Sequence, residues 1–415
     1  MRHIYPYIVN RLHAASQCVC SIPAVVCMAL AGIALSSCER EPMLHLHQGG
    51  TDINMELPAI DLDLKVYWDY LFKYDVEYDW EAEWIYGWDD TDTRLFGPIG
   101  YTEPTFFNVR RYFTGNVAYG QHSAPYKHQI EGNYISAKYD FGYWDILAWN
   151  EIQTEDEVQS VRIDESSTYD YVTAYTGQSM VSSRYNAPQF THAFYQPEEL
   201  FAGYESGIEI NRNLDGFTYD AERNCWVRRL DLQMQPVTYI YLVQIILRNN
   251  HQGVRKVTAI DGSANFSGMS RSVTLNSGQT GLDAITVNFN MRMKQDLTDK
   301  QGNKVDVIGG KVLTFGLPNL NPGKLSTRNY AESLKKVGET DLNNRHYLDL
   351  KMQFYNGMDS TLVFDITDQV RRLFRGGVIT IELDMNKVPL PYRSGGSSFD
   401  AVVKEWEEKE WEIEM

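Results

Sequence analysis

Residues 285–293 read ITVNFNMRM, and this stretch has the most regular pattern in the chain. Apolar and polar residues alternate without a break, with Ile285, Val287, Phe289, Met291 and Met293 on one side and Thr286, Asn288, Asn290 and Arg292 on the other. Successive side chains of a strand point to opposite faces of its sheet, so this alternation predicts a strand with one buried face. The fold is therefore expected to be built on β-structure here.

Similar patterns recur on both sides of this stretch. Strands are predicted at residues 62–68, 141–149, 226–248 with a break at Pro236, 348–354, 362–366 and 379–385, with hairpin turns at 220–224 and Asn356–Gly357. The runs 141–149 and 237–247 are apolar on both faces, which predicts inner strands. No segment has helical periodicity long enough for a βαβ unit, so the sequence predicts an all-β fold of β-sandwich domains.

Two short helical segments are predicted between the strands. Within residues 194–203, Pro197 suits the first position of a helical turn and Gly203 suits its end. Asp368 is expected to cap a short helix from Gln369 to Phe374.

Length and charge exclude some classes of protein. The chain has 415 residues, enough for two ordinary domains, and 43% of them are hydrophobic, which is typical of a globular protein. The net charge of −17 argues against binding nucleic acid, and against binding an anionic membrane through a basic patch.

The N-terminal part has the order of an export signal. Arg2 and Arg11 precede an apolar run, and Leu35-Ser36-Ser37-Cys38 ends it. This ending resembles a bacterial lipoprotein signal, which implies cleavage before Cys38 and lipid attachment, including palmitate, at that cysteine. Residues 1–37 are then the signal peptide and 38–56 a tether. The alternatives are an ordinary signal peptide or a membrane anchor, although the run is shorter than the roughly 20 residues of a spanning helix.

The cysteine count follows from this reading. Cys18, Cys20 and Cys27 belong to the signal and Cys38 carries the lipid, so only Cys225 remains in the mature domains. The mature chain can then form no internal disulfide, and Cys225 is expected to be a small buried side chain.

The sequence offers no catalytic constellation, and we predict no enzyme activity, no cofactor and no metal site. Ser333 and Lys336 have the spacing of acylating serine enzymes but lack the partner motifs. Asp89, Asp90 and Asp92 lack the glycine and glutamate of an EF-hand, so an acidic turn is the simpler interpretation. His45 and His47 are too few for a metal site.

Three tryptophans, Trp80, Trp84 and Trp88, recur at intervals of four residues. The turn residues that follow favour a strand or an irregular hairpin over a helix face. These rings could stack on sugars if they were exposed, while a place in the domain core is the plainer expectation.

Several segments resemble a family of Bacteroidota lipoproteins that is similar to the wider fimbrillin (FimA/Mfa-like) superfamily of pili. The resemblance lies in the acidic start after Cys38 and in the runs 86–89, 96–102, 144–150, 194–203, 236–238, 267–269 and 364–368. It implies two tandem transthyretin-like β-sandwich domains, which we expect at residues 57–228 and 229–415. It also implies an outer-membrane, cell-surface lipoprotein that acts in a fimbrium, in cell adhesion, as a pilus subunit or anchor.

In that superfamily, subunits assemble by β-strand donation, in which a strand of one subunit completes a sheet of the next. Proteolysis after an arginine releases the first strand of stalk subunits, whereas anchor subunits keep the lipid. By residue type alone, the candidates here are Arg94, Arg110 and Arg111. The C-terminal run 411–415 alternates and could be a donor strand or the last strand of its own sheet.

Two functions from different classes therefore remain. The first is a lipid-anchored fimbrillin-like protein whose partners are the outer membrane and other fimbrillin-like subunits. The second is a surface lipoprotein that binds polysaccharide through exposed tryptophans. A hydrolase would need a cleft with converging carboxylates, and no pair of carboxylates stands out in the sequence.

Overall fold

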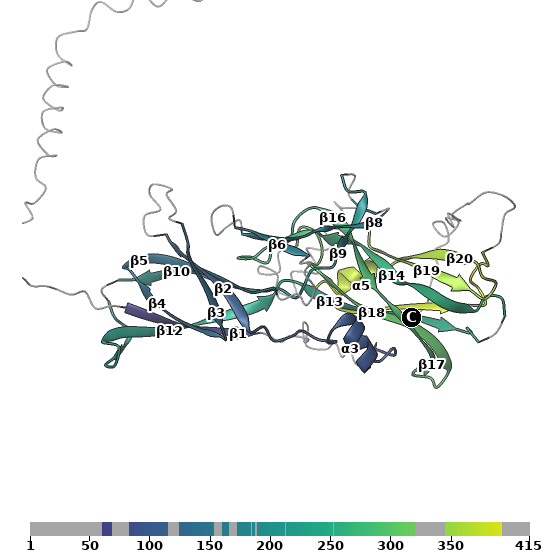
Figure 1. The fold of residues 1–415 in the computed structure, drawn as a ribbon, viewed down its shortest axis with the longest axis horizontal. Helices are drawn as coiled ribbons and strands as arrows, with labels where there is room; N and C mark the ends of the chain where they lie inside the picture. Colours follow the sequence, from purple (N-terminus) through teal and green to yellow (C-terminus); the bar gives the residue numbers. More distant parts are fainter. Residues whose placement is uncertain are drawn as a thin grey trace, which may run out of the picture. The chain divides into compact units, whose positions relative to one another are not determined.

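The computed structural model describes residues 60–68, 83–114, 124–152, 160–165, 172–183, 185–186, 189–211, 213–251, 253–320 and 345–391 (Figure 1). The chain divides into two units, Met1–Leu57 and Pro58–Met415, and all described residues lie in the second. None of the described helices has the length and apolar character needed to span a membrane. The predicted signal, Cys38, the tether and the run 411–415 lie outside the described residues.

The first group of strands forms a sandwich whose strands pair in the order β3-β2-β5-β10-β12-β1-β4, with β11 added beside β12. Their bounds are β1 Ile60–Trp68, β2 Phe106–Phe113, β3 Tyr126–Glu131, β4 Tyr134–Tyr139, β5 Gly142–Asn150, β10 Phe201–Ile210, β11 Thr218–Asp220 and β12 Cys225–Pro236. Strand β12 joins the two layers, because its residues 226–234 pair with β1 and its last two residues pair with β10.

The core of this sandwich consists of large aromatic and aliphatic side chains. Phe107, Ile146 and Phe201 are almost completely buried in it, and Trp144 packs edge-on against Tyr139 with ring centroids 5.0 Å apart. The predicted inner strand 141–149 is confirmed as β5, which pairs with β2 on one side and β10 on the other. Its residues from Trp144 to Asn150 are all buried.

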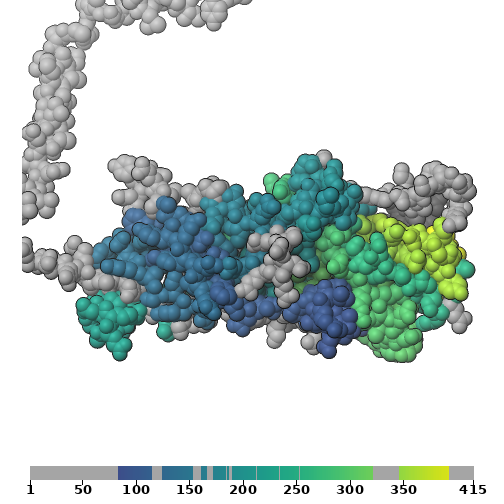
Figure 2. Space-filling model, in the orientation of Figure 1, coloured from purple at the N-terminus to yellow at the C-terminus, as the bar shows by residue number. Residues whose placement is uncertain are grey.

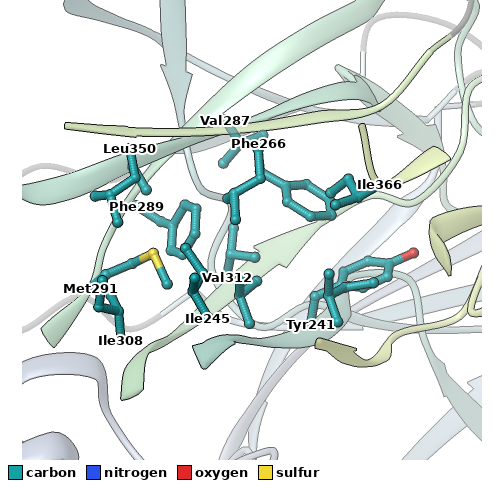
Figure 3. Packing of buried hydrophobic residues seen from close by; sticks show 14 of the residues in the cluster. Tyr241, Ile245, Phe266, Val287, Phe289, Met291, Ile308, Val312, Leu350 and Ile366 are labelled. Atoms are coloured by element: carbon teal, nitrogen blue, oxygen red, sulfur yellow. The ribbon is translucent and has the colours of Figure 1, made fainter. Parts of the chain in front are cut away.

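The second group forms another sandwich from two sheets, ordered β17-β18-β13-β21 and β20-β19-β14-β16-β9-β8. The bounds are β8 Gln178–Ser182, β9 His192–Tyr195, β13 Tyr239–Arg248, β14 Val257–Ser270, β16 Ala284–Asn290, β17 Arg292–Thr298, β18 Lys304–Thr314, β19 Tyr347–Phe354, β20 Asp359–Asp365 and β21 Gly377–Asp384. Figure 3 shows how Tyr241, Phe266, Phe289 and Leu350 fill the space between these sheets.

A small three-stranded sheet, β15-β7-β6, and two short helices complete the described fold. These elements are β6 Val161–Asp164, β7 Thr173–Thr176, β15 Ser272–Thr274, α3 Asp90–Phe96 and α5 Thr367–Arg372.

Strand β13 is buried on both faces, as predicted for an inner strand. Tyr241, Val243, Ile245 and Leu247 point into the core of the second sandwich. On the opposite face, Ile240 and Leu242 belong to the core of the first sandwich, and Ile246 packs in a smaller cluster with Tyr86, Val305 and Val307. A strand with no solvent-exposed face can be apolar at every position, which explains the continuous apolar run.

The all-β prediction is confirmed, and so are the break at Pro236 and the hairpin turn at Asn356–Gly357. The turn at residues 220–224 joins β11 to β12, where Asp220 pairs with Cys225. Cys225 is buried, with 2% of its surface exposed.

The run 285–293 is not one strand, and this corrects the sequence interpretation. Residues up to Asn290 belong to β16, and β17 begins at Arg292 in the other sheet. The buried Met291 joins the two, and its N–H donates to the carbonyl of Gly262. Alternation continues through the crossover because both strands bury the same face in one shared core, so the pattern alone cannot show the change of sheet.

The predicted helical turn within 194–203 is wrong. Residues 196–200 belong to no helix or strand, and they connect β9 to β10. Glu198 accepts hydrogen bonds from the backbone N–H groups of Ser160 and Val161, at 2.6 and 2.8 Å, and Glu199 accepts one from Thr102 at 2.6 Å. The two glutamates therefore bind distant backbone instead of the start of a helix.

Both helices differ from prediction. Helix α5 begins at Thr367, and Ile366 occupies its cap position with no side-chain hydrogen bond, so Asp368 lies in the first turn and is not the cap. The acidic turn at Asp89–Asp92 is the start of helix α3, where Asp89 accepts hydrogen bonds from the N–H groups of Thr91 and Asp92.

The two-domain division at residue 229 stays a prediction, because all described residues belong to one unit. Sheet membership does not follow that position closely. Strand β12 runs through it from Cys225 to Pro236, and β8 and β9 pair into the sheet of β14 and β16 although they precede it in the chain.

Substitution of Gly376 tests the close approach of the loop between α5 and β21. Gly376 has φ of +97°, and an added Cβ would lie 2.3 Å from the carbonyl oxygen of Ile240. We expect Gly376→Ala to lower the free energy of unfolding by about 3 kcal/mol or more, because backbone strain and a clash with main chain combine. Gly357→Ala is the matched control, with φ of +74° and open space around it, and should cost only about 1 kcal/mol. Equal losses in urea unfolding would contradict the packing described here.

The buried His346 should make stability depend on pH. Burial, and repulsion by Arg371, lower the pKa of His346 to about 4, whereas an unfolded chain protonates histidine near pH ~6.5. Between these values the unfolded state binds a proton that the folded state does not, so the free energy of unfolding falls as pH drops from about 6.5 to about 4, by roughly 3 kcal/mol.

Urea unfolding across this pH range checks the expectation. Glu165, whose pKa its hydrogen bond with Arg110 lowers to about 2, loses its contribution only at lower pH, below about 4.5. His346→Gln should remove most of the slope above that value and leave a smaller part from His128, whose pKa burial also lowers. An unchanged slope in His346→Gln would show that another group is responsible.

Candidate functional site

The first described strand, β1, lies inside a sheet and not at its edge. It pairs in parallel with β12 over its full length, from Ile60 opposite Trp226 to Trp68 opposite Met234. On its other side it pairs antiparallel with β4, from Ile60 opposite Tyr139 to Lys65 opposite Tyr134. The backbone of β1 therefore bridges two strands that do not pair with each other.

Removal of β1 would open this sheet beside the core of the first sandwich. Leu232 and Met234 of β12, and Ile135 and Tyr139 of β4, are buried residues of that core. The edges of β4 and β12 would then present unpaired N–H and C=O groups to any extended segment able to replace β1. This position is the candidate site for strand donation.

The three arginines that are candidates for a maturation site by residue type differ in accessibility. Arg94 is exposed on α3 and is followed by Leu95, which is 56% exposed. Arg110 and Arg111 are buried in β2. Arg110 donates to Glu165 at 2.7 Å, and Arg111 donates to the Lys138 carbonyl at 2.8 Å.

The segment 83–96, here called the strap, carries two of the three predicted tryptophans; Trp80 lies outside the described residues. Trp84 and Trp88 are half-buried and surround the fully buried Tyr86, with centroid distances of 5.4 and 6.5 Å to its ring. This cluster covers Ile246, Val305 and Val307. No strand or hairpin forms at the two described tryptophans, and residues 84–89 are an irregular segment that leads into α3.

The buried amide of Gln244, in the centre of β13, binds the backbone of the strap. Its Oε1 accepts from the N–H groups of Ile85 and Tyr86, at 2.9 and 3.3 Å, and its Nε2 donates to the carbonyl of Glu83 at 2.6 Å. Nε2 also donates to the hydroxyl of Thr380 at 2.9 Å. Gln244 is 0% exposed, so its polar atoms are satisfied inside the protein.

A buried ionic cluster attaches the other end of the strap to β17. Asp92 is 0% exposed and accepts from Tyr86 Oη at 2.7 Å, Arg292 Nη1 at 2.9 Å and Lys294 Nζ at 2.6 Å. The pKa of Tyr86 is raised, first by burial and then by its hydrogen bond to Asp92. The hydrogen bond from Lys294, with further hydrogen bonds, holds the pKa of Asp89 well below its usual range. Figure 2 shows the dark-blue strap beside the green strand β17 at the surface.

The sequence interpretation missed Gln244 and Asp92, although one signal was available. Gln244 is the only strongly polar residue in the apolar run YIYLVQIIL of residues 239–247. A polar side chain in an inner strand needs a buried partner, but the sequence alone cannot show that residues more than 150 positions earlier supply it.

The described residues include no group of three or more His, Cys, Asp or Glu side chains placed to hold a metal ion. An open hollow of about 460 Å³ lies between β14 and β17. Its lining contains no carboxylate and consists of Thr258, Ala259, Arg292, Met293, Lys294, Gln295 and Leu297. Ser333, Lys336, His45 and His47 lie outside the described residues.

Gln244→Leu tests the attachment of the strap. The substitution leaves buried or partly buried backbone groups of Glu83, Ile85 and Tyr86 without their partner, so we expect a loss of about 3 kcal/mol in the free energy of unfolding. Hydrogen exchange of residues 84–92 should become faster. Gln295→Leu is the control, because Gln295 is exposed and makes no such hydrogen bond. It should change the free energy of unfolding by less than about 0.5 kcal/mol. Similar effects of both variants would contradict the role of Gln244.

Comparison with known proteins gives structural neighbours only. No protein-family model matches the chain, and no curated protein matches it. The chain is similar to a proposed adhesin from Bacteroides ovatus ATCC 8483, with 16% identity over 82% of this chain and 97% of that chain and a TM-score of 0.44. A second proposed adhesin, from Bacteroides thetaiotaomicron VPI-5482, has 9% identity over 79% and 92% and a TM-score of 0.42. The fimbrial anchor protein Mfa2 from Porphyromonas gingivalis has 11% identity over 78% and 90% and a TM-score of 0.39.

Proposed function

We propose that the chain is a lipid-anchored, cell-surface, fimbrillin-like protein without enzyme activity, which serves as a pilus subunit or anchor and assembles by strand donation. Lipidation at Cys38 of the outer-membrane protein is supported by the order of charged, apolar and small residues before that cysteine. The subunit role is supported by the fimbrillin-like segments of the sequence.

The observation that carries strand donation is the place of β1. The strand nearest the lipid tether occupies an inner position of a sheet and pairs on both sides. A strand of another subunit with the same direction could form the same backbone pairs with β12 and β4. If the chain is cut after the exposed Arg94, the piece that carries β1 is no longer covalently joined to the sandwich.

Glycan binding through tryptophans is the second candidate. Trp84 and Trp88 keep part of their surface exposed, although both indole N–H groups are buried and have no hydrogen-bond acceptor among the described residues. Trp84 also packs against the cores around Tyr86 and Trp144, as the core interpretation expects. If sugars stack on Trp88, Trp88→Ala should abolish retention on a polysaccharide column, whereas loss of stability without loss of retention would contradict it.

Shear fractionation of cells tests the proposed function. Cells carrying the native chain or Cys38→Ser are sheared, crosslinked and probed for this protein and its partners. We expect the native protein in the pilus fraction, crosslinked to other β-sandwich lipoproteins, and we expect Cys38→Ser to release the assembly into the medium. A native protein that stays monomeric on the membrane and crosslinks to no subunit would contradict assembly by strand donation.

A disulfide lock tests whether β1 leaves its sheet during assembly. Leu64 and Leu230 are opposite each other in the β1–β12 register, so cysteines at both positions can fix β1 in place. Strand exchange at β1 predicts that the oxidised variant is absent from the sheared assembly and returns to it on reduction. A control pair at Lys351 and Thr361, opposite in the β19–β20 hairpin, should have no effect in either state. Full assembly of the oxidised Leu64–Leu230 variant would show that β1 stays in its sheet.

A further inference from the structure

Arg271 lies in the turn between β14 and β15, and aromatic rings surround its guanidinium group. The guanidinium carbon is 5.6 Å from the ring centroid of Tyr175, 5.2 Å from Phe190 and 5.5 Å from Phe194. Its main chain is also fixed, because the N–H donates to the Asp283 carbonyl at 3.0 Å and the carbonyl accepts from Thr176 at 3.1 Å. The group is therefore held in a defined position.

Among the described residues, the guanidinium of Arg271 has neither a hydrogen-bond acceptor nor an ion pair, and its Nε is buried without a partner. Other partly buried arginines differ in this respect. Arg110 pairs with Glu165 at 2.7 Å, Arg248 with Asp299 at 2.6 Å and Arg292 with Asp92 at 2.9 Å. A positioned guanidinium with free donors is suited to bind a carboxylate, which accepts two parallel N–H groups.

Exposed apolar side chains lie in the chain segments next to Arg271, and one of these segments is an edge strand among the described residues. Among the described strands, β8 is the last of its sheet. Residues 177–183, GQSMVSS, contain neither a charge nor a proline, and the pairing of β8 with β9 is irregular between Gln178 and Ser182. Met180 is 88% exposed and Val181 is 40% exposed. Leu282, which precedes the Asp283 that bonds Arg271, is 75% exposed.

Register and contacts place these features together. Gln178 of β8 is opposite Phe194 of β9, and Phe194 is one of the rings around Arg271. Thr176, whose N–H donates to the Arg271 carbonyl, lies two residues before β8. Arg271 therefore lies beside the β8–β9 pair, and Arg271 together with the exposed side chains of Met180, Val181 and Leu282 is here called the β8 edge surface.

We propose that the β8 edge surface binds a protein segment that presents an Asp or Glu carboxylate to Arg271 beside apolar side chains. The combination of arginine, aromatic rings and exposed methionine is typical of the centre of a protein interface. The charge also fits, since proteins of this composition are rich in carboxylates, and this chain alone has 55. The inference rests on the proposed function only in taking the partner to be another subunit of the same assembly.

Photocrosslinking on intact cells tests this proposal. A benzoylphenylalanine residue replaces Met180 in the full chain, and adducts are identified by mass spectrometry with Arg271 intact, Arg271→Gln or Arg271→Lys. Arg345→Gln is the matched control, because Arg345 is exposed and lies 3.6 Å from Asp365. We expect an adduct with a subunit at a peptide containing Asp or Glu, lowered about tenfold by Arg271→Gln, partly kept by Arg271→Lys and unchanged by Arg345→Gln.

Three results would overturn the proposal: no adduct at position 180, an adduct that Arg271→Gln does not weaken, or an adduct that is carbohydrate and not peptide. Melting temperatures of the purified variants show whether Arg271→Gln unfolds the chain. If it does, Arg271→Lys, which keeps the charge, is the variant on which the adduct is compared. Shear fractionation of the same cells distinguishes a failure of the β8 edge surface proposal from a failure of the proposed function. If subunits are recovered with the chain but position 180 gives no adduct, only the β8 edge surface is wrong; if no subunit is recovered, the proposed function is wrong.

Discussion

The double burial of strand β13 is the constraint on which the described fold depends. One face contributes Val243 and Ile245 to the core of the second sandwich, and the other contributes Leu242 to the core of the first. A strand with two buried faces needs other parts of the chain packed against both faces of its sheet. Gln244 shows the consequence most clearly, since an amide at 0% exposure would be costly without partners, and the strap supplies them through the backbone of Glu83, Ile85 and Tyr86.

The strap adds to this attachment a contact that only glycine permits. Gly309 of β18 lies under the ring of Tyr86, and a Cβ there would be 2.5 Å from that ring. The missing Cβ leaves room for the ring of Tyr86, whose hydroxyl reaches Asp92 and whose centroid lies 4.1 Å from the ammonium of Lys294. The cost of burying the charge of Asp92 is offset because two cations and a hydroxyl donate to it, and breaking one of these pairs would leave a buried charge without full compensation. These bonds join a segment between β1 and β2 to the sheet of β13, so the two sandwiches share one network of contacts.

The sequence predicts this fold well where the hydrophobic pattern is local. Residues 141–149 and 237–247 are apolar at nearly every position because both of their faces are buried, and Asn356–Gly357 marks its hairpin because few dipeptides suit that turn. The predictions are wrong where residues distant in the sequence determine the local structure. In sequence, Glu198 and Glu199 resemble residues of the first turn of a helix. In the structure, their carboxylates accept hydrogen bonds from the backbone N–H groups of Ser160, Val161 and Thr102. The crossover at Met291 is hidden because both sheets bury one face in the same core, and the sites at Gln244 and Arg271 depend on partners that no local pattern reveals.

The direction of β1 matters for a protein anchored through its N-terminus. If the lipid at Cys38 is held in the membrane, a pull on the sandwiches enters β1 at Ile60 and leaves β12 at Pro236, where the chain continues into β13. Because β1 and β12 are parallel, these two points lie at opposite ends of the paired segment, and the load acts along the strands. Backbone hydrogen bonds from Ile60–Trp226 to Trp68–Met234 then share the force together, whereas a pull applied at one end would break them in turn. Each bond contributes only about 1 kcal/mol on its own, so resistance to detachment comes from the shear geometry of the whole pair, and the same geometry would let a donated strand with the direction of β1 bear load at that position.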